Sequence, residues 1–152
     1  MMRKLATLGV LLALTACGPS TDDGQTMDSC ENDARAQAYV AGLEAASSAG
    51  MFKARWVEGT PAPPDRGNNT WTLEILDPNG SPLTGVTDVR IKAWMPDHGH
   101  GTNPLWNDAT ATDSKFEVGP FNLFMPGLWE FTVSVEAQNQ ADTALVAFCI
   151  KG

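Results

Sequence analysis

Apolar and polar residues alternate with a period of two along most of the chain after residue 51. This period is typical of β-strands that bury one face and expose the other. The clearest example is the segment 129–136, where Trp129, Phe131 and Val133 alternate with polar neighbours. Segments with this pattern, or with a short apolar run, predict strands over 52–57, 71–76, 89–94, 116–118, 121–124, 129–136 and 143–150.

Turn-forming residues separate these segments. Asp77-Pro78-Asn79-Gly80 follows one predicted strand, and Met125-Pro126-Gly127 precedes another. The polar segment 102–112 is expected to be irregular. About seven short strands with turns between them are typical of an antiparallel β-sandwich, and a small barrel is the competing all-β fold.

A helical period replaces the strand period near the N-terminus. The segment 31–48 is rich in alanine, and Ala36, Tyr39 and Leu43 recur at the spacing of one helix face. We therefore predict a short amphipathic helix within residues 30–50, packed against a β-domain that spans residues 51–152.

The first residues have the pattern of an export signal. Arg3 and Lys4 precede an apolar run over 5–14 that is too short to span a bilayer. The run ends in Leu14-Thr15-Ala16-Cys17, which resembles a bacterial lipobox, the signal after which Cys17 becomes the lipidated first residue of a lipoprotein. Residues 1–16 would then be a signal peptide; an ordinary, non-lipidated export signal is the alternative.

The residues after Cys17 suggest a tether and a location. Residues 17–29 are small, polar or acidic, with too little apolar surface to fold alone, and we expect them to be flexible. Gly18, in place of an aspartate, resembles the outer-membrane signal of Gram-negative lipoproteins. The resemblance implies a protein anchored in the outer membrane through lipid, facing the periplasm, with a partner in the cell envelope.

The net charge limits the kinds of molecule that the chain can bind, and the cysteines indicate its redox environment. The formal charge of −8 opposes binding to nucleic acid and to anionic lipid surfaces. After Cys17, the chain has one further pair of cysteines, Cys30 and Cys149. In an exported protein this pair favours a disulfide between the start of the domain and its last strand, although both could instead be thiolate ligands of a metal.

Both histidines of the chain lie in one short loop, Trp94-Met95-Pro96-Asp97-His98-Gly99-His100-Gly101. In extended chain, residues two apart face the same way, so His98 and His100 can offer their imidazoles to one ion. Met95 precedes them, and Met125 lies in a similar Met-Pro-Gly bend. Thioether and imidazole donors together favour copper, chiefly Cu(I), so we expect a copper site of His98, His100, Met95 and Met125.

Neighbouring residues fit a supporting role. Asp97 could orient an imidazole, and Trp94 and Trp129 could shield the site. Each of these residues also has an ordinary interpretation, because an aspartate before such a bend often closes its own turn, and large aromatic or methionine side chains in a sandwich usually pack in the core.

The two Met-Pro bends and the turn at 77–85 together resemble the YtkA-like and FixH-like group of exported bacterial domains. The resemblance covers residues 52–148 and rests on Asp77-Pro78-Asn79-Gly80-Ser81-Pro82-Leu83-Thr84-Gly85, the Met-Pro-Asp-His-Gly-His loop and Phe124-Met125-Pro126-Gly127-Leu128-Trp129. It implies an immunoglobulin-like sandwich, and copper handling or oxidase maturation as the role of some members. FixH-type proteins are held by a transmembrane helix, whereas this chain has the lipobox.

Catalytic motifs are missing from the sequence. It contains no H-E-x-x-H zinc motif, no G-x-S-x-G nucleophile elbow and no phosphate-binding P-loop, so we expect a protein that is not an enzyme. Two non-metal hypotheses stay open beside copper binding: a protein-contact module of an envelope complex, and a structural accessory domain.

Overall fold

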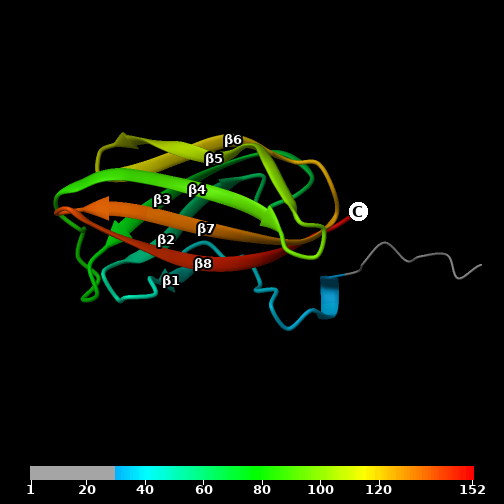
Figure 1. Cartoon of the computed structure of the whole chain (residues 1–152), viewed down its shortest axis with the longest axis horizontal. Coiled ribbons are helices and arrows are strands. Elements are labelled where there is room, and N and C mark those ends of the chain that lie inside the picture. The colour runs from blue at the N-terminus through cyan, green and yellow to red at the C-terminus, as the bar shows by residue number, and fades with distance from the viewer. Residues whose placement is uncertain (1–29) are drawn as a thin grey trace, which may run out of the picture.

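The computed structural model describes residues 30–152 as an all-β domain, which confirms the predicted fold class (Figure 1). The predicted signal peptide, the lipidation site Cys17 and the tether lie outside the described residues. Eight antiparallel strands follow one another in the order β1-β2-β3-β6-β5-β4-β7-β8. They are β1 (Glu44–Ala46), β2 (Lys53–Thr60), β3 (Gly67–Leu76), β4 (Val86–Met95), β5 (His100–Thr112), β6 (Lys115–Leu123), β7 (Gly127–Ala137) and β8 (Gln140–Ile150).

This continuous sheet folds over itself into two layers. β4, β7 and β8 form one layer and β1, β2, β3 and β6 the other, as Figure 1 shows. β5 joins the layers, because its first part pairs with β4 and its last four residues, 109–112, pair with β6. The arrangement therefore combines the two all-β folds that the pattern allows, a sandwich whose layers are joined along one side as in a barrel.

Aromatic side chains fill the space between the layers. Trp71 of β3 is fully buried, and its ring contacts those of Phe121, Phe131 and Phe148 at centroid distances of 5.0, 4.6 and 5.8 Å. These residues come from both layers, as the alternating pattern requires, and burying each ring contributes about 1.5–3 kcal/mol. The core thus holds the two layers together.

The segment 33–51 closes the remaining open side of the sandwich, and the α-helix predicted there is not found. A 3₁₀ turn, η1 (Cys30–Asn32), begins the described chain, which then runs in irregular form to β1. The amide of Gln37 donates to the carbonyl of Ala147 on β8 (2.8 Å), and the amide of Ser48 donates to Thr143 on the same strand (2.9 Å). Tyr39 and Leu43 of this segment contact the core as predicted, but they do so from irregular chain instead of a helix. The hydrogen bonds to β8 outweigh the helix propensity of the alanines here.

Asp142 at the start of β8 holds the end of this segment. The residue is 7 % exposed, and its carboxylate accepts hydrogen bonds from the hydroxyl of Ser48 (2.8 Å) and the amides of Ala49 (3.0 Å) and Met51 (3.2 Å). Burial opposes ionisation, but the hydrogen bonds, including those from the Ser47 and Ser48 hydroxyls, outweigh it and hold the pKa of Asp142 well below its ordinary value.

Two further strand predictions need correction. The segment 102–112, expected to be irregular, forms most of β5. Its composition is polar because most of its residues are exposed on both faces of the strand, so it has no alternating pattern. The two short strands predicted at 116–118 and 121–124 are one strand, β6, which continues through Gly119-Pro120. Within residues 30–152, no helix has the length and apolar character needed to cross a membrane.

Candidate metal site at the end of the sandwich

The β4–β5 hairpin carries both histidines at its turn. Met95 ends β4 and His100 begins β5, and the two residues are directly paired across the hairpin. The carbonyl of Met95 accepts from the amide of Gly99 (2.9 Å) and, at 3.3 Å, from that of His98. Because paired residues of an antiparallel ladder project to the same face, the ring of His100 lies on the face on which Met95 enters the core.

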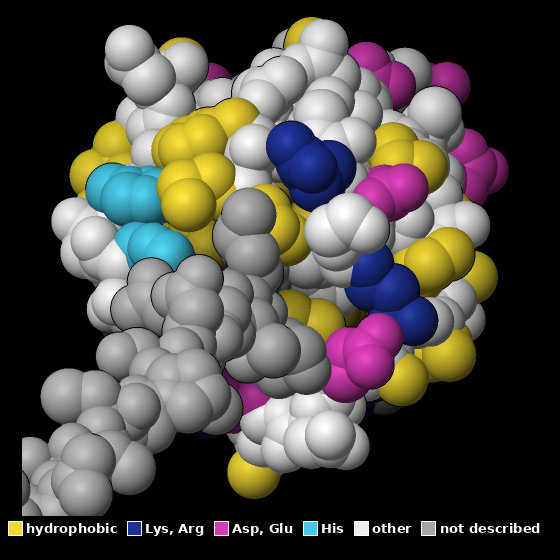
Figure 2. All heavy atoms as spheres, turned by 90° about the vertical axis from the view of Figure 1, so that its right-hand side faces the viewer, with side chains coloured by type: hydrophobic (Ala, Val, Ile, Leu, Met, Phe, Trp, Pro, Cys, Tyr) yellow, Lys and Arg dark blue, Asp and Glu magenta, His cyan; other side chains and the backbone are white. Residues whose placement is uncertain are grey.

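The two imidazoles lie side by side. Their ring centroids are 5.6 Å apart with an interplanar angle of 56°. Figure 2, which faces this end of the molecule, shows both histidines at the surface beside a group of hydrophobic side chains. Two imidazoles that bind one ion through nitrogen at about 2.0 Å keep their centroids within about 6.4 Å of each other. The observed separation satisfies this limit.

Aromatic side chains enclose the half-buried ring of His100. Phe124 stacks on it at a centroid distance of 5.3 Å, and Trp129 approaches it edge-on at 6.5 Å. Among residues 30–152, no protein group hydrogen-bonds the buried Nδ1 atom of His100. A neutral imidazole nitrogen in this position can accept a hydrogen bond or bind a cation.

Both methionines lie at this same end. Met95 is fully buried, and a Cβ built at Gly127 would lie 2.8 Å from its Cε atom, so Met95 packs directly against the start of β7. Met125 is half-buried against the core, and its carbonyl accepts a hydrogen bond from the indole of Trp129 (3.0 Å). Because Met125 follows the Phe124 that stacks on His100, the four predicted ligands gather around one end of the sandwich.

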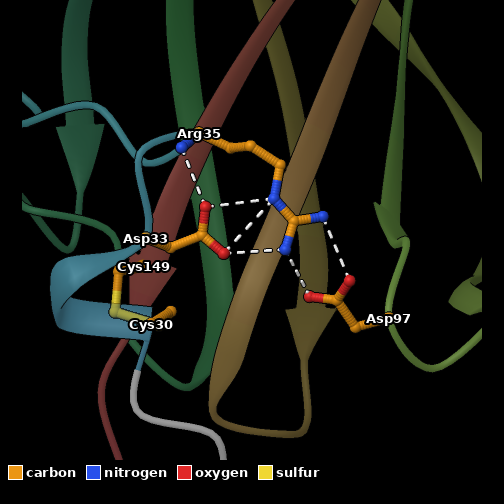
Figure 3. Close-up of polar contacts among 5 residues, drawn as sticks. All are labelled: Cys30, Asp33, Arg35, Asp97 and Cys149. Atoms are coloured by element: carbon orange, nitrogen blue, oxygen red, sulfur yellow. Dashed lines mark hydrogen bonds and ion pairs between the residues drawn. A yellow bond between two sulfur atoms is a disulfide. The ribbon is translucent and has the colours of Figure 1, made fainter.

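Asp97 contacts an arginine that the sequence did not suggest. Arg35 donates from Nη1 to Oδ1 of Asp97 (3.0 Å) and from Nη2 to Oδ2 (2.7 Å), and it also binds Asp33 (Figure 3). Hydrogen bonds from Arg35 lower the pKa of Asp33 to about 2, and those to Asp33 and Asp97 raise the pKa of Arg35. Both oxygens of Asp97 therefore bind the guanidinium. Among the described residues, no hydrogen bond joins Asp97 to either imidazole, so its predicted orienting role stays a prediction.

The segment that carries Arg35 is fixed to β8 on both sides. Cys30 and Cys149 form a disulfide with sulfur atoms 2.02 Å apart, and Gln37 hydrogen-bonds Ala147. Figure 3 shows the disulfide next to the Arg35 network. We name residues 30–37 the N-terminal strap. No pattern along the chain indicates its contact with Asp97, because Arg35 and Asp97 are 62 residues apart.

The tryptophans occupy different positions. Trp129 is fully buried, and its ring approaches that of His100 edge-on, with the centroids 6.5 Å apart. Trp94 is half-buried on the opposite face of β4 from Met95, since neighbouring residues of a strand face opposite ways. Phe124, 46 % exposed, covers His100 and was not suggested by the sequence.

The side chains at this end of the sandwich limit which metal ions they could bind. Within the described part of the chain, no three His, Cys, Asp or Glu side chains are grouped so that they could hold one ion. The other donors predicted beside the imidazole pair are the thioethers of Met95 and Met125. Such soft, uncharged donors select copper over zinc, magnesium or calcium.

Comparison with known proteins gives one match. A family model described as YtkA-like matches residues 57–134, from β2 into β7, and this range includes both histidines and both methionines of the site. No curated protein and no solved structure matches the chain.

Proposed function

The chain belongs to the YtkA-like family, and from this premise we propose that it binds Cu(I) through His98 and His100, and passes the ion to a partner in the cell envelope. The ligands proposed beside the imidazoles are the thioethers of Met125 and Met95. No redox or hydrolytic step is part of this function, and the protein acts as a carrier rather than as an enzyme.

The imidazole pair is the observation that carries the proposal. The ring centroids of His98 and His100 are 5.6 Å apart, and no group of the described chain hydrogen-bonds Nδ1 of His100. This nitrogen is therefore not committed to another residue of the described domain. Here a bound cation would occupy the unpaired position.

The surroundings favour a soft cation. Met125 is half-buried beside Phe124, whereas Met95 is fully buried beneath the turn, so Met125 is the more accessible thioether. Thioether sulfur and neutral imidazole bind Cu(I) more readily than hard divalent ions. A site with few ligands in a turn at the surface also exchanges its ion readily, which suits delivery.

We further propose that the protein works as a lipoprotein. Lipid on Cys17 would hold the domain at the outer membrane, with residues 18–29 giving it reach into the periplasm. In cells supplied with labelled palmitate, the unchanged protein should incorporate the label and a Cys17→Ala variant should not. Absence of label from the unchanged protein, or equal label in the variant, would contradict the lipid anchor.

Competition with a chromogenic Cu(I) chelator under anaerobic conditions tests the copper site. The purified protein should take up one Cu(I), and the His98→Ala/His100→Ala double variant should lose this uptake. Met125→Leu should weaken binding, with Met51→Leu, which changes a half-buried methionine outside the site, as the matched control.

Equal uptake by the double variant and the unchanged protein would refute the site. Absence of uptake by the unchanged protein would leave the alternative, a protein-contact module without metal. The histidines are at the surface or half-buried, so far-ultraviolet circular dichroism should show the same β-structure in all four proteins.

A further inference from the structure

The turn that carries the imidazole pair also carries a carboxylate, that of Asp97, which binds an arginine. Asp97 directly precedes His98 in the turn, and both of its oxygens accept hydrogen bonds from Arg35, at 3.0 and 2.7 Å. This two-point pairing is the strongest geometry that an arginine and a carboxylate adopt. The carboxylate is thus turned to the strap.

Arg35 is itself held in place. Asp33 accepts from Nε of Arg35 at 3.0 Å and from Nη2 at 2.7 Å, and it also accepts from the Arg35 amide at 2.8 Å. Asp33 and Asp97 therefore bind different edges of one planar guanidinium, which fixes its orientation (Figure 3). The disulfide and the Gln37 hydrogen bond hold the strap on which both residues lie.

This arrangement changes the donor set available to a cation. Two imidazoles with a carboxylate form a set that suits Zn(II) and Cu(II), because the carboxylate supplies a hard, negatively charged oxygen. Two imidazoles with thioethers form a softer, uncharged set that suits Cu(I). Engagement of Asp97 by Arg35 removes the carboxylate from the first set and so leaves the second.

We propose that Arg35 determines the metal specificity of the histidine turn by withholding the Asp97 carboxylate from the ion. This proposal rests on the proposed function, since it concerns the same imidazole pair. Arg35 does not touch the metal; it acts through Asp97 and is a positioning residue. A lysine at position 35 would not fulfil this role, because an ammonium group cannot bind both carboxylate oxygens in a fixed plane.

The test compares Zn(II) and Cu(I) binding by four purified proteins: the unchanged chain, Arg35→Met, Asp97→Asn and the Arg35→Met/Asp97→Asn double variant. Arg35→Met should gain about tenfold or more in Zn(II) affinity by isothermal titration calorimetry, because a ligand is released to the site. Its Cu(I) affinity in chelator competition should change much less. Asp97→Asn should bind Zn(II) as weakly as the unchanged chain.

The Arg35→Met/Asp97→Asn double variant identifies the cause of any gain in Zn(II) affinity. If Asp97 is the released ligand, the gain in Zn(II) affinity disappears in the double variant. A gain that persists there would come from the lost positive charge alone and would overturn the assignment to Asp97. Thermal unfolding of each variant checks folding; Arg35 and Asp97 are both exposed, so the midpoints should stay close together.

The outcomes also separate this proposal from the proposed function. Unchanged Zn(II) affinity in Arg35→Met, together with normal Cu(I) binding, would overturn the specificity role and leave the copper site standing. Lack of Cu(I) binding by the unchanged chain would overturn the copper site itself, and the specificity role with it.

Discussion

The disulfide between Cys30 and Cys149 should dominate the stability of the N-terminal strap, and Cys30→Ala/Cys149→Ala is the perturbation that measures it. The two cysteines are 119 residues apart, so the bond closes nearly the whole described chain into one loop. In the chain-entropy description, a loop of this length raises the free energy of unfolding by about 4.9 kcal/mol. Alanine at both positions keeps the small apolar volume beside Leu128 and Ala147.

Guanidinium-induced unfolding, followed by tryptophan fluorescence, gives the free energy of unfolding of both proteins. We expect the double variant to lose about 3–5 kcal/mol, and we expect the unchanged protein to lose the same amount in the presence of a dithiol reductant. A loss below about 1 kcal/mol would refute the reasoning. The strap would then be held by its packing and hydrogen bonds, of which Gln37 to Ala147 is one.

Two further predictions concern a buried carboxylate and a glycine of the site. Asp142→Asn should lower the free energy of unfolding by about 2–3 kcal/mol at pH 7, because an amide cannot accept all the hydrogen bonds that the carboxylate accepts. The pKa of Asp142 is lower in the folded protein than in the unfolded protein, where it is about 4. The carboxylate therefore stabilises the fold fully above about pH 4, and this stabilisation is lost as the pH falls from there toward the folded-state pKa. Denaturation curves of Asp142→Asn and the unchanged protein should converge over that pH range. Gly127→Ala should lower the free energy of unfolding by about 2–3 kcal/mol, because φ is +130° there and the added Cβ would meet Met95. The control Gly99→Ala, at φ +68° with open space around it, should lower it by about 1 kcal/mol. Urea denaturation measures both changes, and equal losses would contradict the packing of Met95 on β7.

The strands were predictable where one face of the sheet is buried. In β7, Trp129, Phe131 and Val133 are fully buried, whereas Glu130 and Thr132 between them are only half-buried, so the pattern along the chain indicates which face is inside. In β5 most residues are exposed on both faces, and no such pattern exists. The segment 33–51 was misread because its alanines favour a helix locally, while its place between β2 and β8 is set by distant hydrogen bonds.

The candidate site was predictable only in part. The two histidines are close in sequence, and their hairpin brings them together as expected, at a centroid distance of 5.6 Å. Two contacts around them depend on the tertiary fold alone: Phe124 on His100, and Arg35 on Asp97. Side chains that meet from different strands leave no periodic signal in a single sequence, so such contacts emerge only from the three-dimensional arrangement.

X-ray absorption at the copper edge of the Cu(I)-loaded protein is the most direct measurement of the central claim, that imidazole and thioether donors meet at one end of the sandwich. The account predicts an inner shell that contains both nitrogen and sulfur, with the sulfur contribution reduced in Met125→Leu and the nitrogen contribution lost in His98→Ala/His100→Ala. A shell of nitrogen and oxygen alone, unchanged by either variant, would contradict it.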